Sequence, residues 1–435
     1  MEDLAVGLGL WHEDVQRIID GFMYGRNPNL REHKIERLDE IYWPRALELQ
    51  VGSLDLFTAR QRKRVQFGYN DFSPDASVQF FEELVSNLNE KKFVSFEDLQ
   101  NLTTQGAIHK TFDWIRAKQY RGVHSSDSVY DKQFERVIPC DLTHPDDSIQ
   151  QLAIWKYKSL MNLADVINAT SFVMHPIPII ETPKGWFGMP YRLSDRRERK
   201  NRFYESMSTL FSYYRDQGFI FPMLIENLEF PKFPATLEEC VEMLGSVKQI
   251  ASSIGVSSDL VGFCFDAQHM RHSYKIINES QNRSAYECHP SIDSFIPGFE
   301  NASQPFFGTS YYEQWQNIVQ KKHVDNAHVL LEKLGSSIHV VHLAGNYESR
   351  DTRVMGFIDE TQGNIPYVDK GSKKDPSMLN IRRVVSKLIE YKINAAVIIE
   401  DQTSGGMISH LRSAQSVESY IKEEQTHYRR RSKLV

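Results

Sequence analysis

The sequence of 435 residues lacks the features of several specialised protein classes. It has only four cysteines, widely spaced and with no CxxC pair, so no disulfide framework is predicted. No run of ~18 apolar residues occurs, and therefore no membrane span is expected. The first residues carry no basic segment ahead of an apolar stretch, which argues against a signal peptide. Together these absences predict a cytoplasmic protein with no membrane association.

A net positive charge and a glycine-rich nucleotide-binding motif are also missing. The net charge is −6, so no global positive field attracts nucleic acid or an anionic membrane. No GxGxxG follows the first predicted strand, which weakens a dinucleotide-binding doubly wound sheet. What is present is an ordinary globular balance, with 41% hydrophobic and 25% charged residues.

Eight short apolar runs alternate with stretches of helical periodicity. Such runs are typical of strands buried on both faces, as in parallel sheets. They cover residues 4–10, 46–51, 136–142, 171–177, 219–227, 260–267, 337–344 and 395–401, and the helical patterns cover 148–168, 236–254, 311–334 and 378–392. Eight strands, most followed by a helix, predict a closed (β/α)8 TIM barrel, with a doubly wound open sheet as the alternative.

A barrel of this kind needs only ~250 residues, so the chain must carry insertions. The longest predicted connection is 52–135, between the second and third predicted strands. We expect a single barrel domain over 1–410, with this insertion as a lid, a dimer arm or a partner surface. Residues 411–435 are expected to form a C-terminal helix and a charged tail. A homo-oligomer is compatible with the sequence.

Ionisable residues lie at the ends of six successive predicted strands. They are Cys140 and Asp141 with nearby His144, then His175, Glu226, Asp266 with His269, His342, and Glu400 with Asp401. In such barrels the carboxyl ends of the strands form one rim, where catalytic groups gather. Crowded carboxylates repel one another and take raised pKa values unless a cation compensates them. Two Glu, one Asp and one His suit Mn²⁺, Co²⁺ or Mg²⁺, with Zn²⁺ also plausible.

Five short motifs resemble the xylose isomerase-like TIM barrel superfamily. They are VMHP (173–176), LIEN (224–227), FDAQH (265–269), VHLAGN (341–346) and VIIED (397–401). This superfamily contains sugar isomerases and epimerases, as well as endonuclease IV-type AP endonucleases. The resemblance implies a shared metal site made of Glu226, Asp266, His342 and Glu400.

The isomerase and epimerase branch implies one metal ion and a sugar or sugar phosphate as substrate. The metal would polarise a carbonyl group and stabilise an enediolate while carboxylates carry the proton. By resemblance those carboxylates are Glu226 and Glu400. By the same resemblance, His269 matches a substrate-binding histidine. Arg350 is a looser match to the arginine that follows the strand-seven histidine in that branch. His175 is a further substrate-binding candidate. We predict this isomerase or epimerase activity as the leading function.

The endonuclease branch implies up to three Zn²⁺ ions and a phosphodiester substrate in abasic or damaged DNA. Glu226 would bridge two metals, and His175 would bind the first with a strand-three histidine, for which Cys140 is the best match. The third metal would need an Asp-x-His pair, whereas this chain has Asp351 and Arg353 there. An arginine does not bind zinc, so the third site looks incomplete.

Two further possibilities stay open at this point. The basic stretch RLSDRRERKNR (192–202) would bind a substrate phosphate or a nucleic-acid backbone, or it is a solvated helix start with Asp195 as its N-cap. The second possibility is that the chain is a non-catalytic barrel that binds a partner. Four buried ionisable groups without a metal would then be costly, which argues against that alternative.

Overall fold

The computed structural model describes most of the predicted elements of the chain. The described residues are 4–10, 45–50, 93–103, 113, 115–125, 128–131, 136–176, 193–228, 233–235, 237–267, 269–270, 327–343, 381–399 and 406–431.

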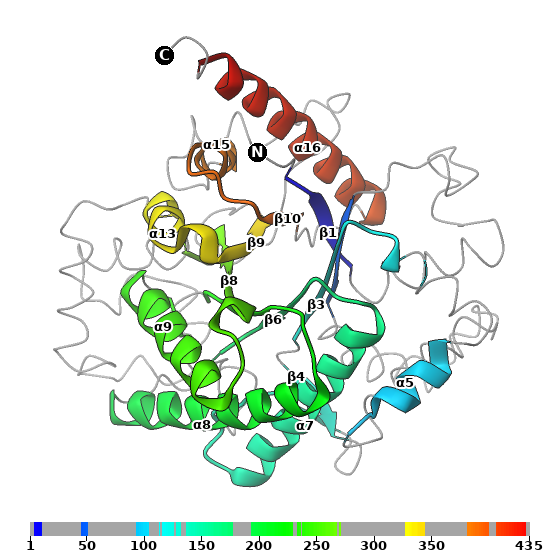
Figure 1. Ribbon diagram of the computed structural model, residues 1–435, viewed down its shortest axis with the longest axis vertical. Helices are drawn as coiled ribbons and strands as arrows, with labels where there is room; N and C mark the ends of the chain where they lie inside the picture. The colour runs from blue at the N-terminus through cyan, green and yellow to red at the C-terminus, as the bar shows by residue number, and fades with distance from the viewer. Residues whose placement is uncertain are drawn as a thin grey trace.

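Eight parallel strands form a closed barrel, which confirms the predicted (β/α)8 fold (Figure 1). Around the barrel the order is β1, β2, β3, β6, β7, β8, β9 and β10, and β10 pairs with β1 to close the ring. The strands span Val6–Leu10, Ala46–Gln50, Tyr120–His124, Ser171–Met174, Met223–Glu226, Val261–Asp266, Ile338–Leu343 and Ala396–Ile399, in that order. Strands β6, β7, β8 and β10 are buried along their whole length, as expected between a packed interior and a layer of helices.

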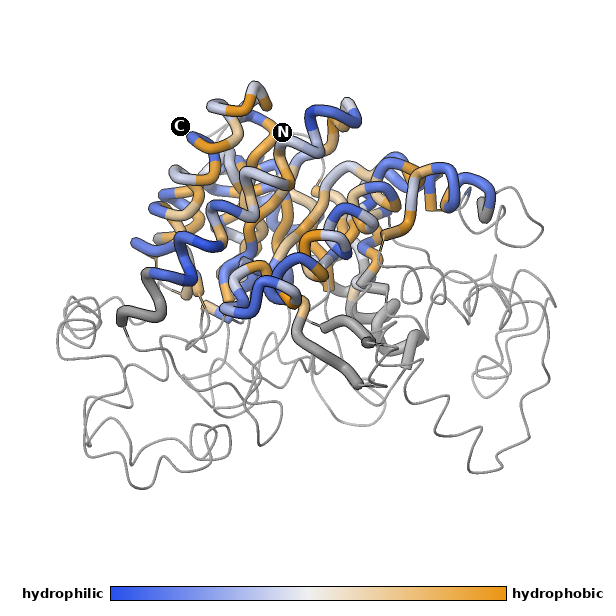
Figure 2. Tube along the Cα trace, turned by 90° about the horizontal axis from the view of Figure 1, so that it is seen from below, coloured by the Kyte–Doolittle hydropathy of each residue, from blue (hydrophilic) through white to orange (hydrophobic). Residues whose placement is uncertain are grey.

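Helices cover the outside of the barrel (Figure 1). The α-helices among the described residues are α5 (Phe96–Thr103), α7 (Asp147–Val166), α8 (Leu193–Gln217), α9 (Leu237–Ile254), α13 (Ala327–Leu334), α15 (Ile381–Glu390) and α16 (Gly406–Arg431), with short 3-10 helices η2 (Ser258–Leu260) and η4 (Gly335–Ser337). Figure 2 shows hydrophobic residues along the strands and hydrophilic residues on the outer sides of the helices. Among the described helices, none combines the length and hydrophobicity that crossing a bilayer requires.

The barrel interior is filled by side chains that alternate along the strands. One apolar cluster consists of Ala5, Ala46, Tyr120, Val173, Leu224, Cys264, Val340, Ala396 and Ile398. Because side chains in a strand alternate between two faces, residues two positions further along share the same face. Those positions hold Glu48, Gly122, His175, Glu226, Asp266 and His342 on six of these strands. The ionisable residues therefore form the next layer of the barrel interior, between this apolar cluster and the carboxyl ends of the strands.

Close packing between β1 and β2 requires a glycine at position 7. A Cβ atom added there would lie 2.2 Å from the carbonyl oxygen of Ala46, and neither backbone can move without breaking the ladder. We expect Gly7→Ala to lower the free energy of unfolding by about 1–3 kcal/mol or more, measured by urea denaturation. Gly245→Ala in α9 is the matched control, since nothing lies within 4 Å of its Cβ position. The control should raise stability by up to ~1 kcal/mol; equal effects of the two changes would contradict this packing.

The third barrel strand is not the one predicted from the sequence. The predicted run 136–142 contains β5 (Arg136–Pro139), which pairs antiparallel with β4 (Ser128–Asp131) in a separate two-stranded sheet. The barrel instead uses β3, which pairs with β2 on one side and β6 on the other. Polar Arg121 and Gly122 interrupt this strand, so it shows no apolar run. It lies inside the stretch 52–135 that the sequence had assigned to an insertion.

The C-terminal helix α16 covers the barrel where β1 and β10 meet. It packs against β1, β10 and α15 and buries Ala414, Val417 and Ile421 in the main core. Its buried Glu418 lies 3.6 Å from Arg45, the residue that precedes β2. The boundary expected at residue 410 falls within this helix.

Residues 193–202 of the basic stretch form the first turns of α8, which begins at Leu193, so Asp195 lies inside the helix and is not its N-cap. Three of its basic side chains contact carboxylates of the same protein. Arg199 is buried and lies 3.1 Å from Asp141, Arg202 lies 2.6 Å from Asp147, and Lys200 pairs with Glu242. Because these charges are already compensated within the chain, they do not support a phosphate-binding surface.

Candidate metal centre

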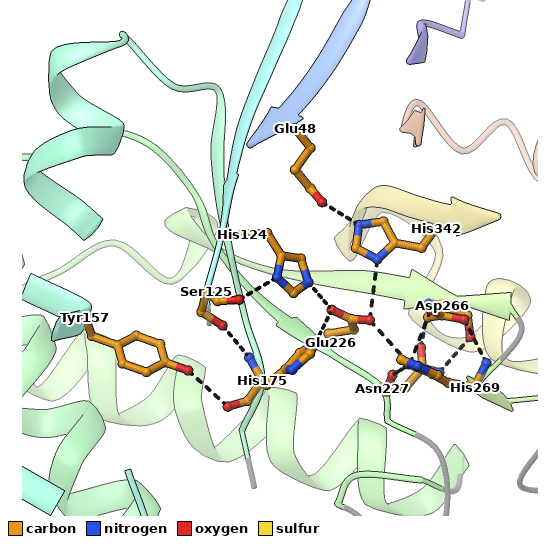
Figure 3. Close-up of polar contacts among 10 residues, drawn as sticks. All are labelled: Glu48, His124, Ser125, Tyr157, His175, Glu226, Asn227, Asp266, His269 and His342. Carbon is orange, nitrogen blue, oxygen red and sulfur yellow. Dashed lines mark hydrogen bonds and ion pairs between the residues drawn. The ribbon is translucent and has the colours of Figure 1, made fainter. Parts of the chain in front are cut away.

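A cluster of buried histidines and carboxylates lies at the carboxyl ends of the barrel strands (Figure 3). Its members are Glu48 from β2, His124 from β3, His175 just after β6, Glu226 at the end of β7, Asp266 and His269 at and after β8, and His342 in β9. Each of these residues is at most 5% exposed. A set of ionisable groups this well shielded from water needs internal compensation for its charges.

Glu226 lies at the centre of the cluster, with two imidazole rings at each carboxylate oxygen. Its Oε2 lies 2.8 Å from Nε2 of His124 and 3.1 Å from Nε2 of His175. Its Oε1 lies 3.4 Å from Nδ1 of His342 and 3.4 Å from Nδ1 of His269. Burial raises the pKa of Glu226, but the facing histidines outweigh it and hold that pKa well below its usual range. The carboxylate is therefore anionic at neutral pH.

The His124 side of the cluster is fixed by Ser125, which follows β3, and by Tyr157 of α7. Nδ1 of His124 lies 2.7 Å from the carbonyl oxygen of Ser125, which only accepts hydrogen bonds, so this nitrogen carries the hydrogen. The Ser125 hydroxyl accepts a hydrogen bond from the His175 N–H at 3.1 Å, and Tyr157 donates to the His175 carbonyl at 3.2 Å. Neighbouring groups thus hold the His124 imidazole and the His175 backbone in place beside the same oxygen of Glu226.

The Asp266 side is organised by Asn227, which follows β7. The Asn227 side chain donates to the Asp266 carbonyl at 2.7 Å and accepts from the Asp266 N–H at 2.9 Å. Nδ1 of His269 lies 3.0 Å from the Asn227 carbonyl oxygen and 3.3 Å from Oδ2 of Asp266. The Asp266 carboxylate also accepts from the His269 N–H at 2.7 Å. Asn227 therefore joins the ends of β7 and β8 and orients both Asp266 and His269.

The donor set fits a bound cation. In its neutral form His124 presents the lone pair of Nε2 to Glu226 Oε2, and two acceptors 2.8 Å apart repel unless a proton or cation lies between them. Four groups of ligand atoms lie close enough together to bind one ion: Glu48–His124–His342, His124–His175–Glu226, Glu226–Cys264–His342 and Glu226–Asp266–His269. Glu226 belongs to three of the four. Imidazole and carboxylate ligands suit Zn²⁺, Mn²⁺, Co²⁺ and Fe²⁺.

The structure brings together five of the residues singled out from the sequence, namely His175, Glu226, Asp266, His269 and His342. Asp266 and His342 are register partners on β8 and β9. Glu400 and Arg350 lie outside the described residues, as do Asp351 and Arg353.

Sequence reasoning missed His124 and Glu48. The histidine that ends the third barrel strand is His124, so the match to Cys140 was wrong; Cys140 follows β5 and belongs to none of the four ligand groups. The short segment YRGVH, with a histidine after a β-branched residue, was the signal for His124. The signal for Glu48 was its place in the predicted strand 46–51, two residues after the buried Ala46.

Comparisons with known proteins find matches among solved structures. No protein-family model and no curated protein matches the sequence. A D-tagatose 3-epimerase-like protein is 13% identical over 74% of this chain and 88% of its own, with a TM-score of 0.42. A 3-keto-D-glucoside 4-epimerase from E. coli is 10% identical over 98% and 100% of the two chains, with a TM-score of 0.45. Endonuclease IV from Thermus thermophilus is 13% identical over 96% and 99%, with a TM-score of 0.40.

These are the two groups of enzymes that the sequence motifs resemble. At such low identity and TM-scores the similarity concerns the fold alone and decides nothing about the reaction.

Proposed function

We propose that this protein is a hydrolase of phosphate esters that works with two divalent cations sharing Glu226. The observation that carries the proposal is the pair of imidazole rings at each oxygen of the Glu226 carboxylate. A carboxylate with ligands on both oxygens is the arrangement expected of a group that bridges two metal ions. Paired ions are common in phosphatases and nucleases, where they stabilise both the attacking and the leaving oxygen.

Two sets of ligands would hold the cations. His124, His175 and Glu226 would bind the first. Glu226, Asp266 and His342 would bind the second together with Glu400, which follows β10 two positions after the interior residue Ile398. When bound, such a pair polarises the phosphate and lowers the pKa of a water molecule. The histidine-rich first set favours Zn²⁺, Mn²⁺ or Co²⁺ over Mg²⁺.

The protein's own residues supply orientation and exclude water. Ser125 and Asn227 hold the ligand residues on either side of Glu226. These residues would therefore need little movement to bind the cations. The apolar layer beneath the cluster, which includes Val173 and Leu224, closes the barrel interior below the site. Glu226 faces histidines at both carboxylate oxygens, so it would serve as a shared ligand.

The second candidate is the metal-dependent isomerase or epimerase of a sugar or sugar phosphate. It needs one cation at Glu226, Asp266, His342 and Glu400. The observation that favours it is the position of His269, whose Nδ1 lies within 3.4 Å of both Asp266 and Glu226, next to where a substrate oxygen would bind. In this alternative Glu226 and Glu400 would carry the proton, and His175, His269 and Arg350 would contact the substrate.

Hydrolysis of bis(p-nitrophenyl) phosphate by the Zn²⁺- or Mn²⁺-loaded protein tests the first candidate. We expect release of p-nitrophenol that stops when a chelator is added and resumes with fresh metal. A duplex with one abasic site tests whether the substrate is damaged DNA, and p-nitrophenyl phosphate tests for monoesters. Failure on all three substrates, together with exchange of solvent deuterium into a ketose, would establish the isomerase instead.

A further inference from the structure

Glu48 is a carboxylate buried inside the barrel, and none of the sequence motifs includes it. It lies in β2 with no exposed surface, in register with Gly9 of β1 and Gly122 of β3. A Cβ atom at Gly122 would lie 2.9 Å from Cγ of Glu48 and 3.1 Å from its Oε2. The missing side chain at position 122 therefore provides the space that Glu48 occupies. Burial of an ionisable group at this depth is costly unless the group has a specific partner.

That partner is His342. Oε1 of Glu48 lies 3.0 Å from Nε2 of His342, and both side chains are fully buried. The other ring nitrogen, Nδ1, lies 3.4 Å from Oε1 of Glu226. His342 is thus held between two carboxylates, one from β2 and one from β7 (Figure 3). A neutral imidazole carries one hydrogen, so its two nitrogens must play different roles.

We propose that Glu48 is a positioning residue of the metal centre, whose carboxylate beside Nε2 holds the His342 ring next to Glu226, where the ring would bind a cation. A carboxylate behind a metal-binding histidine fixes the ring orientation and raises the basicity of the ligand nitrogen. The inference rests on the metal centre proposed above but not on the reaction that the centre performs.

The charge of Glu48 acts in the same direction. The described part of the cluster contains two further carboxylates, Glu226 and Asp266, and Glu48 adds a third negative charge to offset the cations. It does so from behind a ligand, without occupying a coordination position on the Glu226 side. Removal of this charge should weaken cation binding even where the fold persists.

The test compares Zn²⁺ affinity in Glu48→Ala and Glu48→Gln, measured by competition with a chromophoric chelator. We expect Glu48→Ala to bind the second cation about 10–100-fold more weakly. Glu48→Gln should lose less, because glutamine removes the charge but still fills the space beside the His342 ring. The visible spectrum of the Co²⁺-loaded protein should change in Glu48→Ala, since the His342 ligand turns. Glu418→Gln is the control, because this buried carboxylate pairs with Arg45 and Lys422 outside the cluster.

Wild-type affinity and an unchanged Co²⁺ spectrum in Glu48→Ala would overturn the proposal. If Glu48→Ala fails to fold, Glu48→Gln decides by the same two measurements. A wild-type protein that binds no cation would overturn the role of Glu48 as well as the metal centre. A wild-type protein that binds cations but hydrolyses no phosphate ester would overturn only the proposed reaction, and the affinities of the Glu48 variants would still stand.

Discussion

Glu226→Gln is expected to lose both bound cations and all hydrolysis of phosphate esters. The glutamine amide keeps the shape of the side chain but cannot offer an anionic oxygen to each of two ions. Its NH₂ group would also face the histidines that now surround a carboxylate oxygen. Removing one partner from a buried charge pair typically destabilises a protein by about 3–5 kcal/mol. A loss of the same size in the free energy of metal binding corresponds to ~10²–10⁴-fold weaker binding.

Metal content and turnover of bis(p-nitrophenyl) phosphate measure this effect. Asp141→Asn is the matched control, because Asp141 is also fully buried and pairs with Arg199, but it belongs to no ligand group of the described residues. The control should lower thermal stability while both cations remain. Retention of two cations in Glu226→Gln would contradict the bridging role of this carboxylate.

His124→Ala is expected to separate the two candidate functions. In the proposed arrangement His124 is a ligand of the first cation and not of the second, so one cation should be lost and the other kept. The rate of phosphate ester hydrolysis should fall by about 10²–10³-fold, because one of the two cations that would stabilise the charge of the transition state is lost. An isomerase that uses only the second set of ligands should keep most of its activity.

The control for His124→Ala is His339→Ala. His339 belongs to β9 like His342, but it belongs to no ligand group of the described residues, and burial near Lys248 lowers its pKa. We expect this control to keep both cations. Loss of both cations in His124→Ala, or of neither, would contradict two ligand sets joined at Glu226.

Most of the barrel could be predicted because buried parallel strands leave a direct mark on the sequence. Runs such as 260–267 and 337–344 are continuous and apolar, and the strands observed there are Val261–Asp266 and Ile338–Leu343. The strand that was missed, β3, is interrupted by Arg121 and Gly122. Gly122 is needed to make room for Glu48, so the feature that hid the strand is one that the site requires.

The candidate site was predictable only where its residues end an apolar run. Glu226, Asp266 and His342 do so, and a shared rim followed from the barrel topology. His124 and Glu48 depend on contacts between residues more than 100 positions apart, such as His124 with Glu226. Local periodicity carries no record of such contacts, so these two residues become apparent only in the folded structure.

The number of cations bound per chain tests the central claim most directly. The purified wild-type protein would be stripped with a chelator, reloaded with Zn²⁺ or Mn²⁺, and its metal content measured by mass spectrometry against protein concentration. We expect two ions per chain in the wild-type protein and one in His124→Ala. A single ion in the wild-type protein, unchanged in His124→Ala, would contradict it.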